Sequence, residues 1–223
     1  KAVIPSFIKV IGQYAFANCR QLKTVEFEEH SQLEIIDSFS FCNTFIENIS
    51  IPSSVKRIGI SSFASCSQLK SIQFTEDSEL YSIGKSAFFM SSLERIVIPP
   101  LVDSIEECTF LMCEKLQKVK ISEKSKLKYI EKYAFTSSSI KSLTIPSSLA
   151  YFNDNSLSQA CNLTDIEIIQ NNQKNVMYYN NEFILFKSDP LSIDFDILVF
   201  ARKDIEKVII PSFIKRIAPY AFD

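Results

Sequence analysis

Residues 51–72 read IPSSVKRIGISSFASCSQLKSI, and this stretch decides the fold of the chain. Its end runs into the pattern LKSIQF at residues 69–74, where apolar and polar positions alternate with the period of two that a β-strand requires. A matching strand ends at Ile51, because Pro52 cannot donate a hydrogen bond to a β-ladder. The stretch therefore predicts a strand at each of its ends.

The middle of the stretch predicts a second strand and a compact turn. Residues 54–58 alternate polar and apolar side chains, which indicates a short strand on another side of the unit. Gly59 then marks a turn, although other copies carry Asp, Glu or Asn there, so the position does not require a positive φ. Phe63 and Cys66 lie three residues apart, as on one face of a single helical turn.

The unit repeats along the chain. Two series of phenylalanines are each spaced by 47 residues, and they interleave in steps of 25 and 22 residues. The repeat is therefore a unit of 22 to 25 residues in alternating long and short copies, and it predicts a stacked ladder of rings. The phenylalanines are Phe16, Phe41, Phe63, Phe88, Phe110 and Phe135.

The apolar strand pattern occurs eight times. One copy cannot bury its apolar side alone, but stacked copies form a continuous core with a parallel sheet along one face. Units this short leave no room for the crossover helices of a doubly wound α/β fold. The copies begin at Leu22, Ile46, Leu69, Leu93, Leu116, Ile140, Leu163 and Ile205.

The motif of residues 51–72, I-P-x-x-V-x-x-I-G-x-x-A/S-F-x-x-C-x-x-L-x-x-I, resembles the BspA-like subclass of leucine-rich repeats over nearly the whole chain. The resemblance implies one leucine-rich-repeat solenoid over residues 1–223, of the α/β type and rich in β-structure. It implies a parallel β-sheet on the concave face, with short second strands and single helical turns elsewhere. Proteins of this family are typically surface antigens of bacteria and parasitic protists, associated with adhesion to host cells, matrix proteins or other microbes.

The period is interrupted once. Repeats run in 47-residue pairs over residues 1–168, residues 169–203 break the pattern, and residues 204–223 resume it and stop in mid-repeat. Because neither end shows a polar capping repeat, we expect the chain to be a fragment of a larger protein. We also expect that the uncapped solenoid ends allow self-association.

The irregular stretch resembles the hairpin-bearing insert of this family. Its pattern predicts strands at residues 176–179 and 183–186, joined by an Asn180-Asn181 turn, and a third strand at residues 194–200. Its aromatic rings either form an exposed anchor for a partner or cover the core where the repeat breaks. These rings are Tyr178, Tyr179, Phe183 and Phe186.

The residues that flank the centre of each strand are expected to point outward on the concave face of a curved solenoid. Along the stack they are acidic or polar, then basic, then acidic. They form either a charge-patterned binding surface or a solvated sheet face that only prevents aggregation. The candidate partner-binding residues are Glu26, Asn48, Gln73, Arg95, Lys118, Lys120, Thr144, Asp165 and Glu167.

The sequence offers little for catalysis or for a cofactor. His30 is the only histidine, and neither a C-x-x-C nor a G-x-S-x-G motif occurs. With 3 glycines the chain has no phosphate-binding loop. An S-x-x-K match at residues 138–141 includes the core strand position Ile140 and is accidental. We therefore predict a chain that is not an enzyme, with no catalytic, cofactor or metal site.

The six cysteines are expected to be reduced core thiols. Cys19, Cys66 and Cys113 lie two repeats apart, so about 10 Å separates neighbours, which is beyond disulfide reach. Reduced thiols in the core are compatible with either an oxidising or a reducing compartment.

Charge and hydropathy limit the partners. The formal net charge of −2 argues against general nucleic-acid binding. No apolar run of about 18 residues occurs, which predicts no membrane insertion within this chain. The leading hypothesis is a cell-surface or extracellular adhesion module that binds a protein or glycan ligand. The alternative is a cytoplasmic scaffold or regulatory repeat domain that uses the same face.

Overall fold

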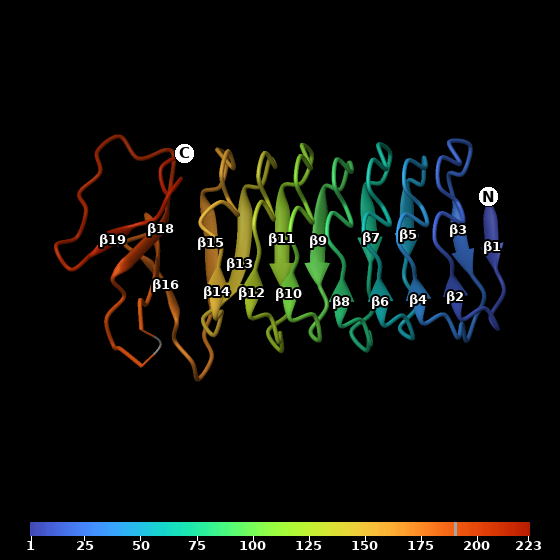
Figure 1. Ribbon diagram of the computed structural model, residues 1–223, viewed down its shortest axis with the longest axis horizontal. Helices are drawn as coiled ribbons and strands as arrows, with labels where there is room; N and C mark the ends of the chain where they lie inside the picture. The colour runs from blue at the N-terminus through green and yellow to red at the C-terminus, as the bar shows by residue number, and fades with distance from the viewer. Residues whose placement is uncertain (190) are drawn as a thin grey trace.

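The computed structural model describes residues 1–189 and 191–223; Pro190, within the expected insert, lies outside the described residues. The chain winds into similar coils that stack along one long axis (Figure 1). Each regular coil contributes one strand to a long parallel sheet and a two-residue strand to a second sheet. The solenoid expected from the repeat is confirmed.

The long sheet runs the length of the stack (Figure 1). An isolated parallel bridge between Thr24 and Asn48 joins its first two strands to the other six. The predicted strand pattern is thus confirmed in seven of its eight copies. The strands are β1 (Ala2–Ile4), β3 (Val25–Phe27), β5 (Asn48–Ser50), β7 (Ser71–Gln73), β9 (Arg95–Ile98), β11 (Lys118–Ile121), β13 (Ser142–Pro146) and β15 (Asp165–Ile169).

The second sheet lies on another side of the coils and forms in two parallel pieces. It contains the short strand predicted within residues 54–58, which spans Arg57–Ile58. The first piece is β2 (Val10–Ile11), β4 (Ile35–Ile36), β6 (Arg57–Ile58) and β8 (Ser82–Ile83), and the second is β10 (Ser104–Ile105), β12 (Tyr129–Ile130) and β14 (Tyr151–Phe152).

The turn after the second strand is not helical. No helix occurs among the described residues, and the expected helical turn at Ser62–Cys66 is a series of hydrogen-bonded turns. Ser61 and Ser65 have positive φ values of 51° and 57°. Their N–H groups donate to Lys85 and Phe89 of the next coil, at 2.9 and 2.7 Å, rather than along the turn. Bonds between coils therefore replace the bonds that a helix would make.

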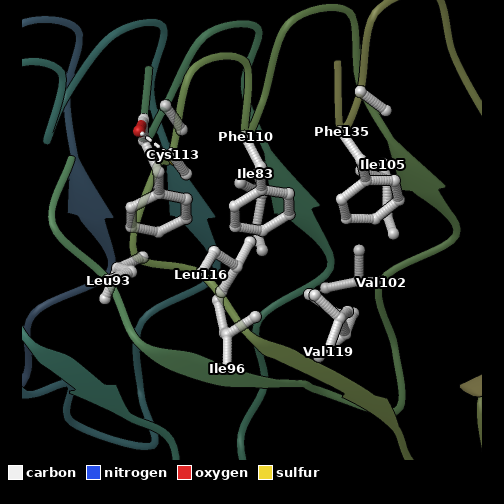
Figure 2. Packing of buried hydrophobic residues seen from close by; sticks show 14 of the residues in the cluster. Ile83, Leu93, Ile96, Val102, Ile105, Phe110, Cys113, Leu116, Val119 and Phe135 are labelled. Carbon is white, nitrogen blue, oxygen red and sulfur yellow. Dashed lines mark hydrogen bonds between the residues drawn. The ribbon is translucent and has the colours of Figure 1, made fainter. Parts of the chain in front are cut away.

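The phenylalanine ladder predicted from the spacing is present. Neighbouring rings from Phe16 to Phe135 have centroids 5.2 to 5.7 Å apart and planes within 13° of parallel. Figure 2 shows the rings of Phe110 and Phe135 side by side along the stack, with Leu116 and Val119 beneath them. Such pairs add about 0.5–1.5 kcal/mol each beyond the area that they bury.

A column of thiols and hydroxyls runs beside the rings and repeats with the period of the 47-residue double unit. The thiol of Cys66 donates to the carbonyl of Phe41 at 3.1 Å and lies 3.4 Å from the hydroxyl of Thr44. Two coils later, Cys113 lies 3.5 Å from Ser91 and donates to Phe88 at 3.0 Å. Thiol and hydroxyl thus alternate from coil to coil.

Burial raises the pKa of both Cys66 and Cys113 to about 11. The six cysteines are unbridged and all lie within the described residues. The expectation of core thiols is wrong for Cys19 and Cys161, which are exposed. In the seventh copy the cysteine is displaced by one residue, so Ala160 occupies the buried position of the column and Cys161 lies outside it.

Two of the three glycines, Gly59 and Gly84, lie where neighbouring coils approach closely. None of the three glycines, all described, has a positive φ. A Cβ atom on Gly59 would lie 2.4 Å from the backbone nitrogen of Ser38, and one on Gly84 would lie 2.8 Å from Gly59. A Cβ on Gly12 would meet nothing within 4 Å. At positions 59 and 84, glycine is therefore needed for its lack of a side chain and not for a positive φ.

Gly59→Ala is expected to lower the free energy of unfolding by about 1–3 kcal/mol, because the added carbon overpacks the backbone of the preceding coil. Gly12→Ala should be neutral or stabilising by up to about 1 kcal/mol, because it only restricts the unfolded chain. Denaturant unfolding of the two variants measures both changes. Equal destabilisation of both variants would contradict the close-approach explanation.

The irregular stretch forms the predicted hairpin. β16 (Val176–Tyr179) pairs antiparallel with β17 (Phe183–Phe186), and the connecting Asn180 and Asn181 have positive φ. The third predicted strand lies a few residues later, as β18 (Ile197–Ala201), antiparallel to β17. β19 (Arg216–Ile217) completes this sheet and runs parallel to β18.

Both faces of the β17–β18 pair are buried. Ile184 and Phe186 pack into the main core, whereas Phe183, Leu185 and Leu198 form a second small core. Ala221, from the resumed repeat, belongs to that second core. The hairpin therefore lies between the regular coils and the last residues of the chain, and it packs against both.

The backbone hydrogen bonds between β18 and the resumed repeat follow the same pattern as those between two regular coils. The N–H groups of Lys215 and Arg216 both donate to Asp196, at 2.9 and 3.1 Å, and Ala218 donates to Leu198 at 2.8 Å. In regular coils the N–H groups of residues 56, 57 and 59 make the same three bonds to residues 34 and 36. Hydrogen bonds from Ser188, with Lys215 nearby, lower the pKa of the buried Asp196 to about 2.

The eighth predicted strand, at residues 205–210, is not formed. Its residues are mostly exposed and show no β-ladder pairing. The last strand of the long sheet, β15, is followed by β16, which contacts it. The resumed repeat therefore meets the hairpin sheet, and no neighbouring strand of the long sheet pairs with residues 205–210.

Candidate binding face

The outward side chains of the long sheet lie in two rows, which together we name the ladder face. The rows follow from the parallel register, which pairs Asn48 with Ser71 and Lys118 with Arg95. One row contains Thr24, Asn48, Ser71, Arg95, Lys118, Ser142 and Asp165, and the other contains Val3, Glu26, Ser50, Gln73, Val97, Lys120, Thr144 and Glu167.

The nine residues chosen from the sequence all belong to these rows. Eight of them are exposed, but Thr144 is 4% exposed and departs from the expectation. It lies beside Glu167 in the register, and its hydroxyl donates to the Glu167 carboxylate at 3.3 Å. Thr144 therefore orients Glu167 and presents little surface to a partner.

Three hollows follow one another along the ladder face. The first, of about 700 Å³, is lined by Glu26, His30 and Asn48 among others. The second, of about 500 Å³, is lined by residues of β7, β9 and β11, and the third, of about 540 Å³, includes Lys120 and Glu167. The ladder face therefore carries a row of open depressions.

Some neighbouring strands of the ladder face are linked through their side chains. Ser71 donates to Asn48 at 2.7 Å, and Ser50 donates to Gln73 at 3.3 Å. Farther along, Ser142 donates to Asp165 at 2.7 Å. The sequence pattern gave the rows but not these links, because they depend on side-chain rotamers.

One ion pair on this face was missed by the sequence reasoning. The ammonium of Lys1 lies 2.8 Å from the carboxylate of Glu26. Its signal in the sequence is the start of an earlier strand copy, Ala2–Ile4, which places Lys1 one coil before Glu26. The negative charge of Glu26 is therefore already balanced by Lys1 of the same chain.

The hairpin aromatics cover the core and form no exposed anchor. Phe183 and Phe186 are buried, and Phe186 contacts Phe152 with ring centroids 5.7 Å apart. Tyr179 is half-buried and packs edge-on against Phe213 at 5.4 Å. Of the two interpretations of these rings, the core-covering one is therefore correct.

No other site stands out in the described part of the chain. Its His, Cys, Asp and Glu residues include no group of three placed to hold a metal ion. His30 is exposed, with a φ of 56°, at the edge of the first hollow. Residues 1–189 and 191–223 contain no helix long and apolar enough to cross a membrane.

Known proteins share this architecture. The chain matches the BspA type leucine-rich repeat region, with six copies, over residues 1–117, 81–187 and 115–223. A leucine-rich repeat protein from Bacteroides ovatus is 29% identical with a TM-score of 0.65, covering 77% of this chain and 44% of that one. No curated protein matches the chain.

Two further solved structures share the fold. A leucine-rich cell surface protein from Faecalibacterium prausnitzii is 21% identical with a TM-score of 0.59, covering 82% of this chain and 54% of that one. A leucine-rich repeat protein from Eubacterium ventriosum is 21% identical with a TM-score of 0.57, covering 100% and 50%. The chain thus spans about half the length of these proteins. Because the repeat match extends from its first residue to its last, the chain belongs to the BspA-type leucine-rich repeat family.

Proposed function

We propose that residues 1–223 act as one non-enzymatic recognition domain at a cell surface, where the ladder face binds a protein or glycan ligand. The observation that carries the proposal is the ladder face itself, with exposed charges in register and three successive hollows. A rigid array of this kind presents many contacts at low entropic cost. The surface location is supported by the typical location of the family and by the cell surface protein of similar fold.

Binding of the intact chain to immobilised matrix proteins and host-cell glycans tests the proposal. Lys118→Glu combined with Asp165→Lys is expected to weaken binding at least about tenfold, because charge on an interface selects the partner. Arg57→Glu combined with Lys128→Glu changes exposed residues on the second-sheet side and should leave binding within about twofold. Equal losses in both double variants, or binding unchanged by either, would refute the ladder face as the site.

A cytoplasmic scaffold using the same face makes a different prediction. It requires partners that the extracellular panel does not contain, and its longer gene product would carry a cytosolic domain. A signal peptide or an anchor in the flanking sequence would support the surface role instead.

A further inference from the structure

We infer that the step between β9 and β11 is an anion-binding centre, and that its occupant is an acidic peptide segment of a partner protein with aliphatic side chains. This inference rests on the proposed function, because it assigns a ligand class to part of the same ladder face. Three cations and one exposed aliphatic residue form the centre. They are Arg95, Lys118, Lys120 and Val97.

In the part of the chain that the structure describes, four steps of the ladder face have no side-chain hydrogen bond or ion pair across them, and the β9–β11 step is the one of these that pairs two cations in register. The β1–β3, β5–β7 and β13–β15 pairs each carry at least one side-chain hydrogen bond or ion pair across the step. Among the described residues, the side chains of Arg95, Lys118 and Lys120 have no hydrogen bond or ion pair with any other group. The cations of β9 and β11 are therefore available to a ligand.

The register also places like charges opposite one another. Arg95 pairs directly with Lys118, and Lys120 lies two residues farther along the same strand. Two like charges in register destabilise a sheet, and a carboxylate on either strand would remove that cost. Adjacent strands lie about 4.8 Å apart, so one carboxylate can contact both cations. Arg95 can hold it with two parallel hydrogen bonds, which makes an acidic ligand the natural complement of this step.

An aliphatic contact favours a peptide over a charged sugar. Val97 lies in register beside Lys120 and is 55% exposed, in a hollow of about 500 Å³ whose wall includes Phe74. Phe74 is half-buried and is the one aromatic residue that lines this hollow, so the described residues offer a sugar little ring surface for stacking. The β9 and β11 backbones already pair within the sheet, so the peptide is recognised by its side chains.

The test measures fluorescence anisotropy with two labelled peptides, one alternating Glu and Val and one alternating Glu and Ser. The Glu-Val peptide should bind saturably, weaken as salt rises from about 0.05 to 0.3 M, and bind at least about threefold tighter than the Glu-Ser peptide. Lys118→Glu and Lys120→Glu should each weaken binding at least about tenfold, whereas Arg57→Glu should not.

A second readout separates ligand binding from structure. Lys118→Glu places a carboxylate opposite Arg95, so its Tm should rise by about 1–3 °C while peptide affinity falls. Absence of saturable peptide binding, or a Tm that falls together with affinity, would overturn the inference. So would a sulfated oligosaccharide of equal charge that binds more tightly than the Glu-Val peptide. If Asp165→Lys weakens binding to matrix ligands but Lys118→Glu does not, this centre fails while the proposed function stands.

Discussion

Phe88→Ala is expected to lower the free energy of unfolding by about 3–5 kcal/mol, measured by chemical denaturation. The ring is fully buried and stacks on Phe63 at 5.7 Å and on Phe110 at 5.4 Å. Removing it deprives two neighbouring coils of a stacking partner and leaves a void that the closely packed coils fill only in part. Because stability in a solenoid depends on contacts between neighbouring repeats, the substitution weakens the packing of the coils on both sides of Phe88.

Phe16→Ala provides the matched control. Phe16 is half-buried and has one stacking partner in the ladder, Phe41, at 5.2 Å. The same change of side chain should therefore cost less than half as much there. Equal losses at Phe16 and Phe88 would show that the ring ladder does not stabilise the stack in the way described.

Leu198→Asp is expected to destabilise the hairpin sheet by more than about 4 kcal/mol, because an ionised carboxylate has no partner in the second core. Leu198 is fully buried, and its carbonyl accepts the hydrogen bond from Ala218. The damage should stay local, since each unit of a solenoid contacts mainly its neighbours. Hydrogen exchange should show Lys215, Arg216 and Ala218 exchanging freely while β9 and β11 stay protected.

Ile193→Asp is the control for that experiment. Ile193 is 88% exposed in the same irregular stretch, so the same kind of substitution should leave exchange protection unchanged. If Leu198→Asp instead removes exchange protection from β9 and β11, the damage is not local, and the hairpin sheet unfolds together with the regular coils.

The sequence predicted the elements that depend on repetition. The phenylalanine spacing predicted a ring ladder, and the two kinds of alternation predicted both sheets, because stacking repeats must place equivalent residues in register. The prediction of a helical turn was wrong at Phe63 and Cys66, since a spacing of three residues also suits a turn bounded by residues of positive φ, here Ser61 and Ser65. Bonds between coils decide which of the two forms, and those bonds are invisible in one repeat.

Tertiary context explains the other errors. The apolar pattern at residues 205–210 matches the strand copies, but a strand needs a neighbouring strand, and this segment meets the hairpin sheet instead. At the candidate site, register predicted the rows correctly. It could not predict that Thr144 is buried beside Glu167, because the burial of Thr144 depends on the conformation of the longer side chains next to it.

Lysine acetylation footprinting tests most directly whether the ligand lies on the ladder face. The chain is labelled free and when bound to the tightest ligand from the matrix panel, and modification of each lysine is quantified by mass spectrometry. We predict that the ligand protects Lys118 and Lys120 and leaves Lys128 and Lys132, which are exposed on other parts of the coils, fully reactive. Protection of Lys128 and Lys132, with Lys118 and Lys120 still reactive, would contradict the account.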